Sequence, residues 1–295
     1  MNRLDGNQWS DLTLDDYQRS AAETDVEGDS DDPIVPLLGL GGEVGSLAAE
    51  FKKKRRPDGV AYAGFDEIVV EELGDILWYL AALARRVGVP LSLVASGNLA
   101  KTRDRWLASE GPPPRAFDEG FPQEQRLPRQ FEVTFRIVDD RVVMQIDGDA
   151  IGDPIDDNAR VADGYRFHDV FHLGYLAVLG WSPILRALLK RKRKADPEID
   201  RAEDGARACA MEEAIAAFVF EMARPYAFFD GTEHVDDLIL RGVKAVAAGL
   251  EVGARTSADW ERAILTGFAA WRNIRAADGG VVLVDQDRRT LEFVG

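Results

Sequence analysis

Carboxylates recur at helical spacing in two segments of the first hundred residues. Glu43 and Glu50 lie two turns apart in one segment, and Glu72 and Asp75 lie one turn apart in the other. Because residues three or four positions apart share a helix face, each pair is expected to point the same way. Apolar residues flank both pairs, so the carboxylates would repel one another and lose hydration. A hard divalent cation such as Mg²⁺ would relieve both costs; the alternative is two solvated edges of amphipathic helices.

Four helices are expected around these carboxylates, over residues 13–24, 36–54, 65–88 and 90–108. After them the composition changes, because residues 111–130 are rich in proline and glycine and cannot sustain a helix. The sequence therefore predicts a helical domain over residues 1–110, a proline-rich linker over 111–130 and a second module over 131–295.

The second module combines both kinds of periodicity. Alternating residues at 131–137 and 142–146, with a turn at Asp139-Asp140, predict a β-hairpin. Two further short strands are expected at 281–285 and 290–294. Between the two hairpins, helical patterning covers 166–194, 203–224, 234–251 and 257–275. The expected fold is mainly α: a four-helix bundle followed by an α+β module with hairpins at both ends.

The order of motifs over residues 12–106 adds a family resemblance. Its pieces are Leu14-Asp15-Asp16-Tyr17-Gln18, Leu38-Gly39-Leu40-Gly41-Gly42-Glu43, Lys52-Lys53-Lys54 and Glu71-Glu72-Leu73-Gly74-Asp75. In this order they resemble the MazG-like, all-α nucleoside triphosphate pyrophosphohydrolases. That family carries E-x-x-E on one helix and E-x-x-D on the next. Glu43, Glu72 and Asp75 match the pattern, but Ser46 stands where the second glutamate is expected, and Glu50 lies one turn beyond it.

The resemblance implies Mg²⁺-dependent (or Mn²⁺-dependent) hydrolysis of a nucleoside triphosphate to a monophosphate and pyrophosphate. Metal bound by Glu43, Glu50, Glu72 and Asp75 would bridge carboxylates to phosphates and lower the pKa of an attacking water. The candidates for contacts with the substrate are Lys53, Lys54, Asn98, Lys101 and Arg105. The basic run at 52–56 also suits a helix C-terminus, which favours cations. Ser46 favours an alternative, a protein that binds or senses nucleotides without turnover.

Two histidines raise a separate hypothesis in the second module. His168 and His172 lie at i and i+4, and the pair Glu212-Glu213 opens a later helix. Imidazole and carboxylate together suit Zn, Mn or Fe, so a second metal site, or a hydrolase centred on it, is one interpretation. The pattern differs from the zincin H-E-x-x-H because Asp169 replaces the glutamate and no third ligand is evident. The alternatives are histidines held by hydrogen bonds in the core or contributing to nucleotide binding.

Both halves carry a basic run followed by a paired-glutamate helix, at 52–56 and 71–72 and again at 190–194 and 212–213. This order suggests an internal duplication. The second half would then pack against the first as an internal pseudo-dimer; otherwise the chain would form a homodimer.

Composition narrows the class of protein. The net charge of −16, from 36 basic and 52 acidic residues, argues against a nucleic-acid partner. One cysteine, Cys209, rules out an intrachain disulfide and favours a reducing compartment. No signal-peptide pattern and no run approaching 18 consecutive apolar residues is present, which predicts a cytoplasmic protein without a membrane partner.

Overall fold

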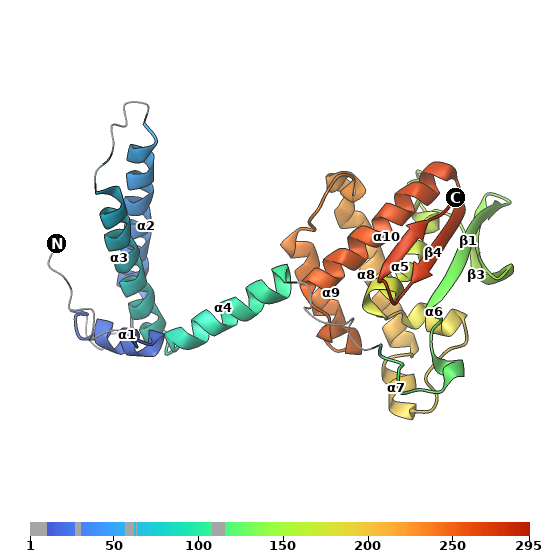
Figure 1. The fold of residues 1–295 in the computed structure, drawn as a ribbon, viewed down its shortest axis with the longest axis horizontal. Coiled ribbons are helices and arrows are strands. Elements are labelled where there is room, and N and C mark those ends of the chain that lie inside the picture. Colours follow the sequence, from blue (N-terminus) through green and yellow to red (C-terminus); the bar gives the residue numbers. More distant parts are fainter. Residues whose placement is uncertain (1–10, 27–30, 57–61, 63, 108–115) are drawn as a thin grey trace. The chain divides into compact units, whose positions relative to one another are not determined.

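The computed structural model describes residues 11–26, 31–56, 62, 64–107 and 116–295. The chain falls into two compact units, unit 1 (residues 1–102) and unit 2 (residues 103–295). Figure 1 shows the elements of each, coloured from blue at the N-terminus to red at the C-terminus. The described residues are mostly helical, with one antiparallel sheet of five strands.

Unit 1 is built from helices α1 (Leu14–Ala22), α2 (Ile34–Lys54), α3 (Phe65–Arg86) and most of α4 (Leu91–Trp106). Thr13 and Asp16 form a reciprocal capping box at the start of α1. Both α1 and α2 pack on α3. Gln18 donates a hydrogen bond to the carbonyl of Val89 (3.1 Å) and accepts one from the amide of Leu91 (2.9 Å), which fixes the turn where the axis bends by 105° from α3 to α4.

The apolar core of unit 1 is small. Its buried residues Ala81, Ala84 and Leu91 are joined by Tyr17, Ala21 and Leu77. Large apolar side chains of α2 are exposed instead: Ile34, Val35, Leu37, Leu38, Val44 and Phe51. By length and composition alone α2 could also cross a membrane, a property that counting consecutive apolar residues had not revealed. An exposed apolar surface of this kind marks an interaction surface.

The sheet of unit 2 joins both ends of the module. Its strands are β1 (Gln130–Val138), β2 (Arg141–Ile146), β3 (Asp149–Ile155), β4 (Gly280–Asp285) and β5 (Thr290–Phe293), in the order β3-β2-β1-β4-β5. The two expected hairpins are confirmed, and β3 is an additional strand. Asp139 and Asp140 both have positive φ (51° and 61°), as a tight two-residue hairpin turn requires.

The helices of unit 2 are α5 (Asp169–Leu179), α6 (Pro183–Leu188), α7 (Pro197–Ala202), α8 (Ala206–Ala223), α9 (Asp237–Ala247) and α10 (Ser257–Ala277). The helix expected over 166–194 is interrupted, because Gly180 takes a left-handed conformation (φ 68°) and Pro183 starts α6. All residues of α5 from Val170 to Leu179 are buried. Helices α5 and α10 pack together and against β4 and β5.

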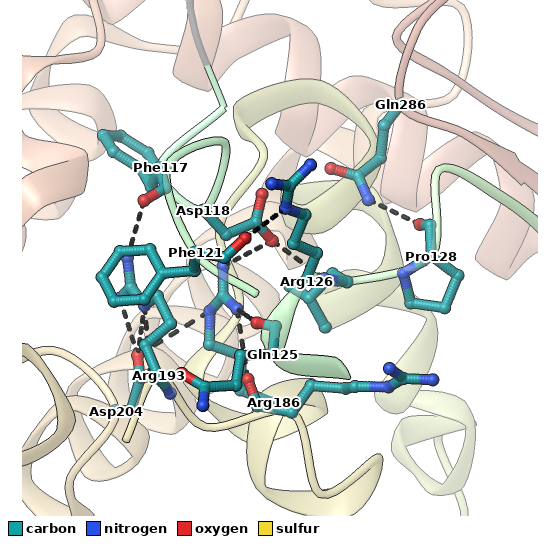
Figure 2. A network of polar contacts seen from close by, with 12 residues as sticks. Phe117, Asp118, Phe121, Gln125, Arg126, Pro128, Arg186, Arg193, Asp204 and Gln286 are labelled. Atoms are coloured by element: carbon teal, nitrogen blue, oxygen red, sulfur yellow. Dashed lines mark hydrogen bonds and ion pairs between the residues drawn. The ribbon is translucent and has the colours of Figure 1, made fainter. Parts of the chain in front are cut away.

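Residues 116–129, expected as part of a linker, pack on unit 2 through two buried residues, Asp118 and Leu127. Asp118 is 2% exposed and accepts hydrogen bonds from Arg186 (3.0 Å) and from the amide of Leu127 (2.8 Å). Figure 2 shows this contact beside the buried pair Arg193–Asp204, whose nearest atoms are 2.6 Å apart. These buried charges are paired, which is the condition under which burial is tolerated.

The predicted internal duplication is wrong. Unit 2 is organised around a five-stranded sheet, whereas the described residues of unit 1 contain helices and no strand. The shared order of basic run and paired glutamates therefore reflects composition and not one fold repeated twice. The pseudo-dimer and the homodimer stay predictions.

Candidate functional site

The acidic residues of unit 1 come from two packed helices. Glu43 lies on α2, and Glu72 and Asp75 lie on α3. The Oε2 atom of Glu72 is buried and has no hydrogen-bond partner among the described residues. Burial raises the pKa of Glu72, and the charges of Glu43, Asp75 and Glu50 raise it further. The carboxylates are thus close enough to repel one another without a compensating group, a condition that a bound cation relieves.

Glu50 has protein partners of its own. It is buried on α2 and accepts hydrogen bonds from the Lys53 ammonium and the Tyr62 hydroxyl. These two contacts lower the pKa of Glu50. Lys54 lies 3.6 Å above the ring of Phe65. Glu50 and Lys53 are therefore engaged with each other, and Lys54 covers the start of α3.

Helix α4 divides the remaining substrate candidates. Asn98 and Lys101 are exposed on its unit 1 portion. Arg105 belongs to unit 2, where it is buried, lies 3.0 Å from a carboxylate oxygen of Glu261 and donates to the carbonyl of Val235 (2.9 Å). These contacts give Arg105 a structural role in unit 2, and the roles of Asn98 and Lys101 stay predictions.

A second group of chemically active side chains lies at the start of α5. His172 is fully buried, and its Nδ1 lies 3.0 Å from Oε1 of Glu212 on α8. The same carboxylate accepts from the Ser182 hydroxyl (2.7 Å) and the Ile184 amide (2.9 Å). Burial lowers the pKa of His172, but the charge of Glu212 and the hydrogen bond to it outweigh burial and raise the pKa to about 10.

His168 completes this group one turn earlier. Its ring stacks on Tyr165 at 4.5 Å, and its Nδ1 lies 3.0 Å from the Tyr165 carbonyl. Among the described residues, His168, Asp169 and His172 form a set of three whose ligand atoms all lie within 4.8 Å of one another. Glu213 faces the same histidines, which lower its pKa although burial opposes them. One interpretation of the sequence is that the histidines bind a metal with Glu212 or Glu213. The sequence does not show that Glu212 contacts Nδ1 of His172 while Glu213 faces its Nε2.

Comparison with known proteins finds a family for residues 112–295 and a similar protein for the N-terminal part. The model of the MazG C-terminal domain matches residues 112–295. In its N-terminal part the chain is similar to the Gene 37 protein of Mycobacterium phage L5, with 39% identity over 102 residues. That match covers 32% of this chain and 89% of the phage protein. No solved structure matches the chain.

Proposed function

This chain belongs to the MazG C-terminal domain family, and from that premise we propose that unit 1 is a Mg²⁺-dependent nucleoside triphosphate pyrophosphohydrolase. It would convert a nucleoside or deoxynucleoside triphosphate and water to the monophosphate and pyrophosphate. One observation carries the proposal: Oε2 of Glu72 is buried, has no hydrogen-bond partner in the part of the chain that the structure describes, and is affected by the charges of Glu43 and Asp75. A cation coordinated there would offset the repulsion that the protein itself leaves uncompensated.

The residues fit a hard cation because their donors are carboxylate oxygens. Glu43, Glu72 and Asp75 would hold Mg²⁺ or Mn²⁺ across α2 and α3. The bound ion supplies charge neutralisation of the phosphates and a water of lowered pKa. Asn98 and Lys101, exposed on α4, are the proposed contacts to the substrate. Arg105 is left out of this site because of its pairing with Glu261 in unit 2.

Ser46 supports a second candidate, a protein that binds nucleotides without turnover. Ser46 is exposed at the α2 position where the family pattern has a glutamate, so it offers no carboxylate. Glu50, the residue that could substitute for it, is paired with Lys53 and Tyr62. This site would then hold fewer or weaker metal ions than the full pattern.

We further propose that unit 1 completes a helical bundle by binding a second copy of the chain. Its own core is small, and the apolar residues of α2 are exposed. Unit 2 has a different fold and offers no second half of the same kind. A membrane is a poorer partner, because Glu43 lies at the middle of α2, where a charged side chain costs on the order of 3 kcal/mol.

The test is product analysis with a panel of canonical and damaged triphosphates and Mg²⁺ or Mn²⁺. Monophosphate, pyrophosphate and orthophosphate are quantified separately for the wild type, Glu72→Gln and the control Glu67→Gln, which alters an exposed glutamate on the same helix. Equal monophosphate and pyrophosphate, lost in Glu72→Gln and kept in Glu67→Gln, supports the enzyme. Nucleotide binding without product supports the sensor and refutes turnover at this site.

A further inference from the structure

Metal-binding atoms from two helices of unit 2 converge where the start of α5 faces α8. The Nε2 atom of His172 is fully buried and has no hydrogen-bond partner among the described residues. His168, which precedes α5, Asp169, its first residue, and Glu213 on α8 lie around it. We propose that His168, His172 and Glu213 form a binding site for a transition metal ion of the Zn²⁺ class, separate from the Mg²⁺ site proposed for unit 1.

The contacts of the two imidazoles use Nδ1 of each ring, so Nε2 of each ring is the nitrogen that could bind a metal. Nδ1 of His172 faces the Glu212 carboxylate, and Nδ1 of His168 faces the Tyr165 carbonyl, each at 3.0 Å. Both acceptors require a proton on Nδ1, so Nε2 is the nitrogen that is left to a metal ion. An ion bound there would displace any proton that Nε2 carries, as metal ions do when they bind histidine. Histidines that bind metals in proteins are oriented in this way, by a carboxylate or a backbone carbonyl on the opposite nitrogen.

Glu213 supplies the third ligand that the sequence pattern lacked. Its Oε1 lies 3.6 Å from Nε2 of His172, and its Oε2 lies 3.7 Å from Nε2 of His168. Two ligands bound to one tetrahedral Zn²⁺ at about 2.1 Å lie about 3.4 Å apart. The two separations that involve Glu213 are therefore close to those between ligands of one ion, whereas the ligand atoms of His168, Asp169 and His172 lie within 4.8 Å of one another and would draw closer on binding. Asp169, 3.9 Å from Nε2 of His168, lies within reach as a further oxygen donor.

The scaffold around these ligands is rigid. Glu212 is fully buried and joins α5 to the start of α6 by accepting from His172, Ser182 and Ile184. On the other side, the backbones of α5 and α10 touch, since a Cβ atom added to Gly174 would lie 3.0 Å from the Cα of Gly267. A site held this firmly needs little rearrangement to accept an ion.

The ligand atoms favour one class of metal, and a bound ion would be accessible to solvent. Two imidazoles with carboxylates suit Zn²⁺, Mn²⁺ or Fe²⁺ better than Mg²⁺, which prefers oxygen ligands alone. The side chain of Glu213 is 48% exposed and that of His168 is 12% exposed, so solvent reaches this side of the cluster. Three protein ligands would leave the fourth tetrahedral position to water.

The test uses the full-length chain, stripped of metal and carrying Glu72→Gln so that the unit 1 site does not contribute. Zn²⁺ is titrated by calorimetry, and Co²⁺ is titrated by its visible absorption, which reports the ligand geometry. We expect one ion per chain. His168→Ala should weaken binding at least about 100-fold, the upper end of the loss seen when a residue that merely orients a ligand is removed.

His234→Ala is the matched control, because it removes the third histidine of the chain, which is exposed and lies 3.3 Å from Glu261. It should leave the affinity within about twofold. Because His172→Ala would alter the core, Glu213→Gln is the second variant, and circular dichroism verifies folding. A folded wild type that binds neither ion, or equal affinities in the wild type and His168→Ala, overturns the proposal. Neither result depends on pyrophosphohydrolase activity, which is measured in chains without the Glu72 substitution.

Discussion

The carboxylates of unit 1 and the histidines of unit 2 both lie on paired helices, but the support behind them differs. In unit 1, Glu72 is surrounded by like charge and no described group neutralises it. In unit 2, His172 lies between Glu212, which orients it, and Glu213, which faces its free nitrogen. In unit 2, charged protein groups of opposite sign already lie next to one another without an ion. In unit 1, the negative charges near Glu72 would need a bound cation to neutralise them.

The helices that carry the two sites also differ in how deeply they are buried. Helix α5 is buried along almost its whole length, whereas α2 buries only Pro36 and Glu50. A site in a dense core is fixed by its scaffold. A site on a thin bundle gains order from what binds it, by the linkage between binding and folding. We therefore expect ligands to stabilise unit 1 more than unit 2, and substitutions of polar residues to damage unit 2 more than unit 1.

The largest effect is expected at the residue that supports the histidines. Glu212→Ala leaves His172, Ser182 and the Ile184 amide without their acceptor inside the core. Loss of a partner from a buried charged network costs about 3–5 kcal/mol. Urea unfolding followed by fluorescence of the buried Trp181, Trp260 and Trp271 measures it. The control is Glu213→Ala at the half-exposed neighbour, which should lower the free energy of unfolding by less than about 1 kcal/mol. Equal losses in the two variants would contradict the difference in role between Glu212, which orients His172, and Glu213, the proposed metal ligand.

A somewhat smaller loss is expected at Asp118, which holds residues 116–129 in unit 2. Burial raises the pKa of Asp118, but the Leu127 amide and the charges of Arg186 and Arg129 outweigh it and lower the pKa. A lowered pKa in the folded state stabilises the protein above the ordinary value of 3.8. Asp118→Asn should cost about 3 kcal/mol at pH 7.

The pH dependence of that loss has a defined sign. The difference between the wild type and Asp118→Asn should be constant at neutral pH and shrink as the pH falls below 3.8 toward the lowered pKa of the folded state. Urea unfolding at several pH values measures it, with the exposed turn variant Asp140→Asn as a control. A difference that grew on acidification would contradict this account.

Ser46→Glu tests whether unit 1 lacks one carboxylate. The new side chain would lie one turn after Glu43 on α2 and restore the E-x-x-E pattern. An added negative charge about 4 Å from a doubly charged ion contributes about 2 kcal/mol in water, so Mg²⁺ should bind about thirtyfold more tightly. Calorimetry measures the affinity, and Ser46→Gln, of equal length without charge, should show no gain. Unchanged affinity in both variants would mean that this position does not face the metal.

The smallest effect is expected on the melting temperature of the metal-free protein when Glu72 is replaced by glutamine. Glu72→Gln removes a charge that its neighbours disfavour, so the metal-free variant should melt slightly above the wild type at pH 7. Added Mg²⁺ should raise the melting temperature of the wild type and not that of the variant. Thermal melts by circular dichroism decide this, and a variant that melts lower without metal would show that Glu72 is already balanced.

Local patterns predicted much of the fold. The hairpin turn at Asp139-Asp140 and the helices that carry Glu43 and Glu72 follow from side-chain periodicity within short windows. Strand β3 was missed because Gly152 and Pro154 lie within it, although Asp147-Gly148, with φ of 52° and 86°, is a recognisable hairpin turn.

Pairings between distant residues could not be predicted. Arg105 is bound by Glu261, a partner that no local pattern reveals, so its charge alone had suggested a contact with phosphate. Glu212 and Glu213 are adjacent in the sequence, yet one lies in the core and the other is half-exposed. Which of them orients His172 and which faces its free nitrogen depends on how α8 packs, which spacing does not determine.

The strand order has a consequence for how the chain folds during synthesis. The central strand β1 pairs with β2, which follows at once, and with β4, whose Gly280 lies opposite Phe135. Until the ribosome has released β4 and β5, one edge of β1 stays unpaired, and such an edge is prone to aggregation. The buried surface of α5 likewise waits for α10. Unit 1, whose described residues all leave the ribosome before those of unit 2, should fold early, and unit 2 should fold late, in one slow step dominated by long-range contacts.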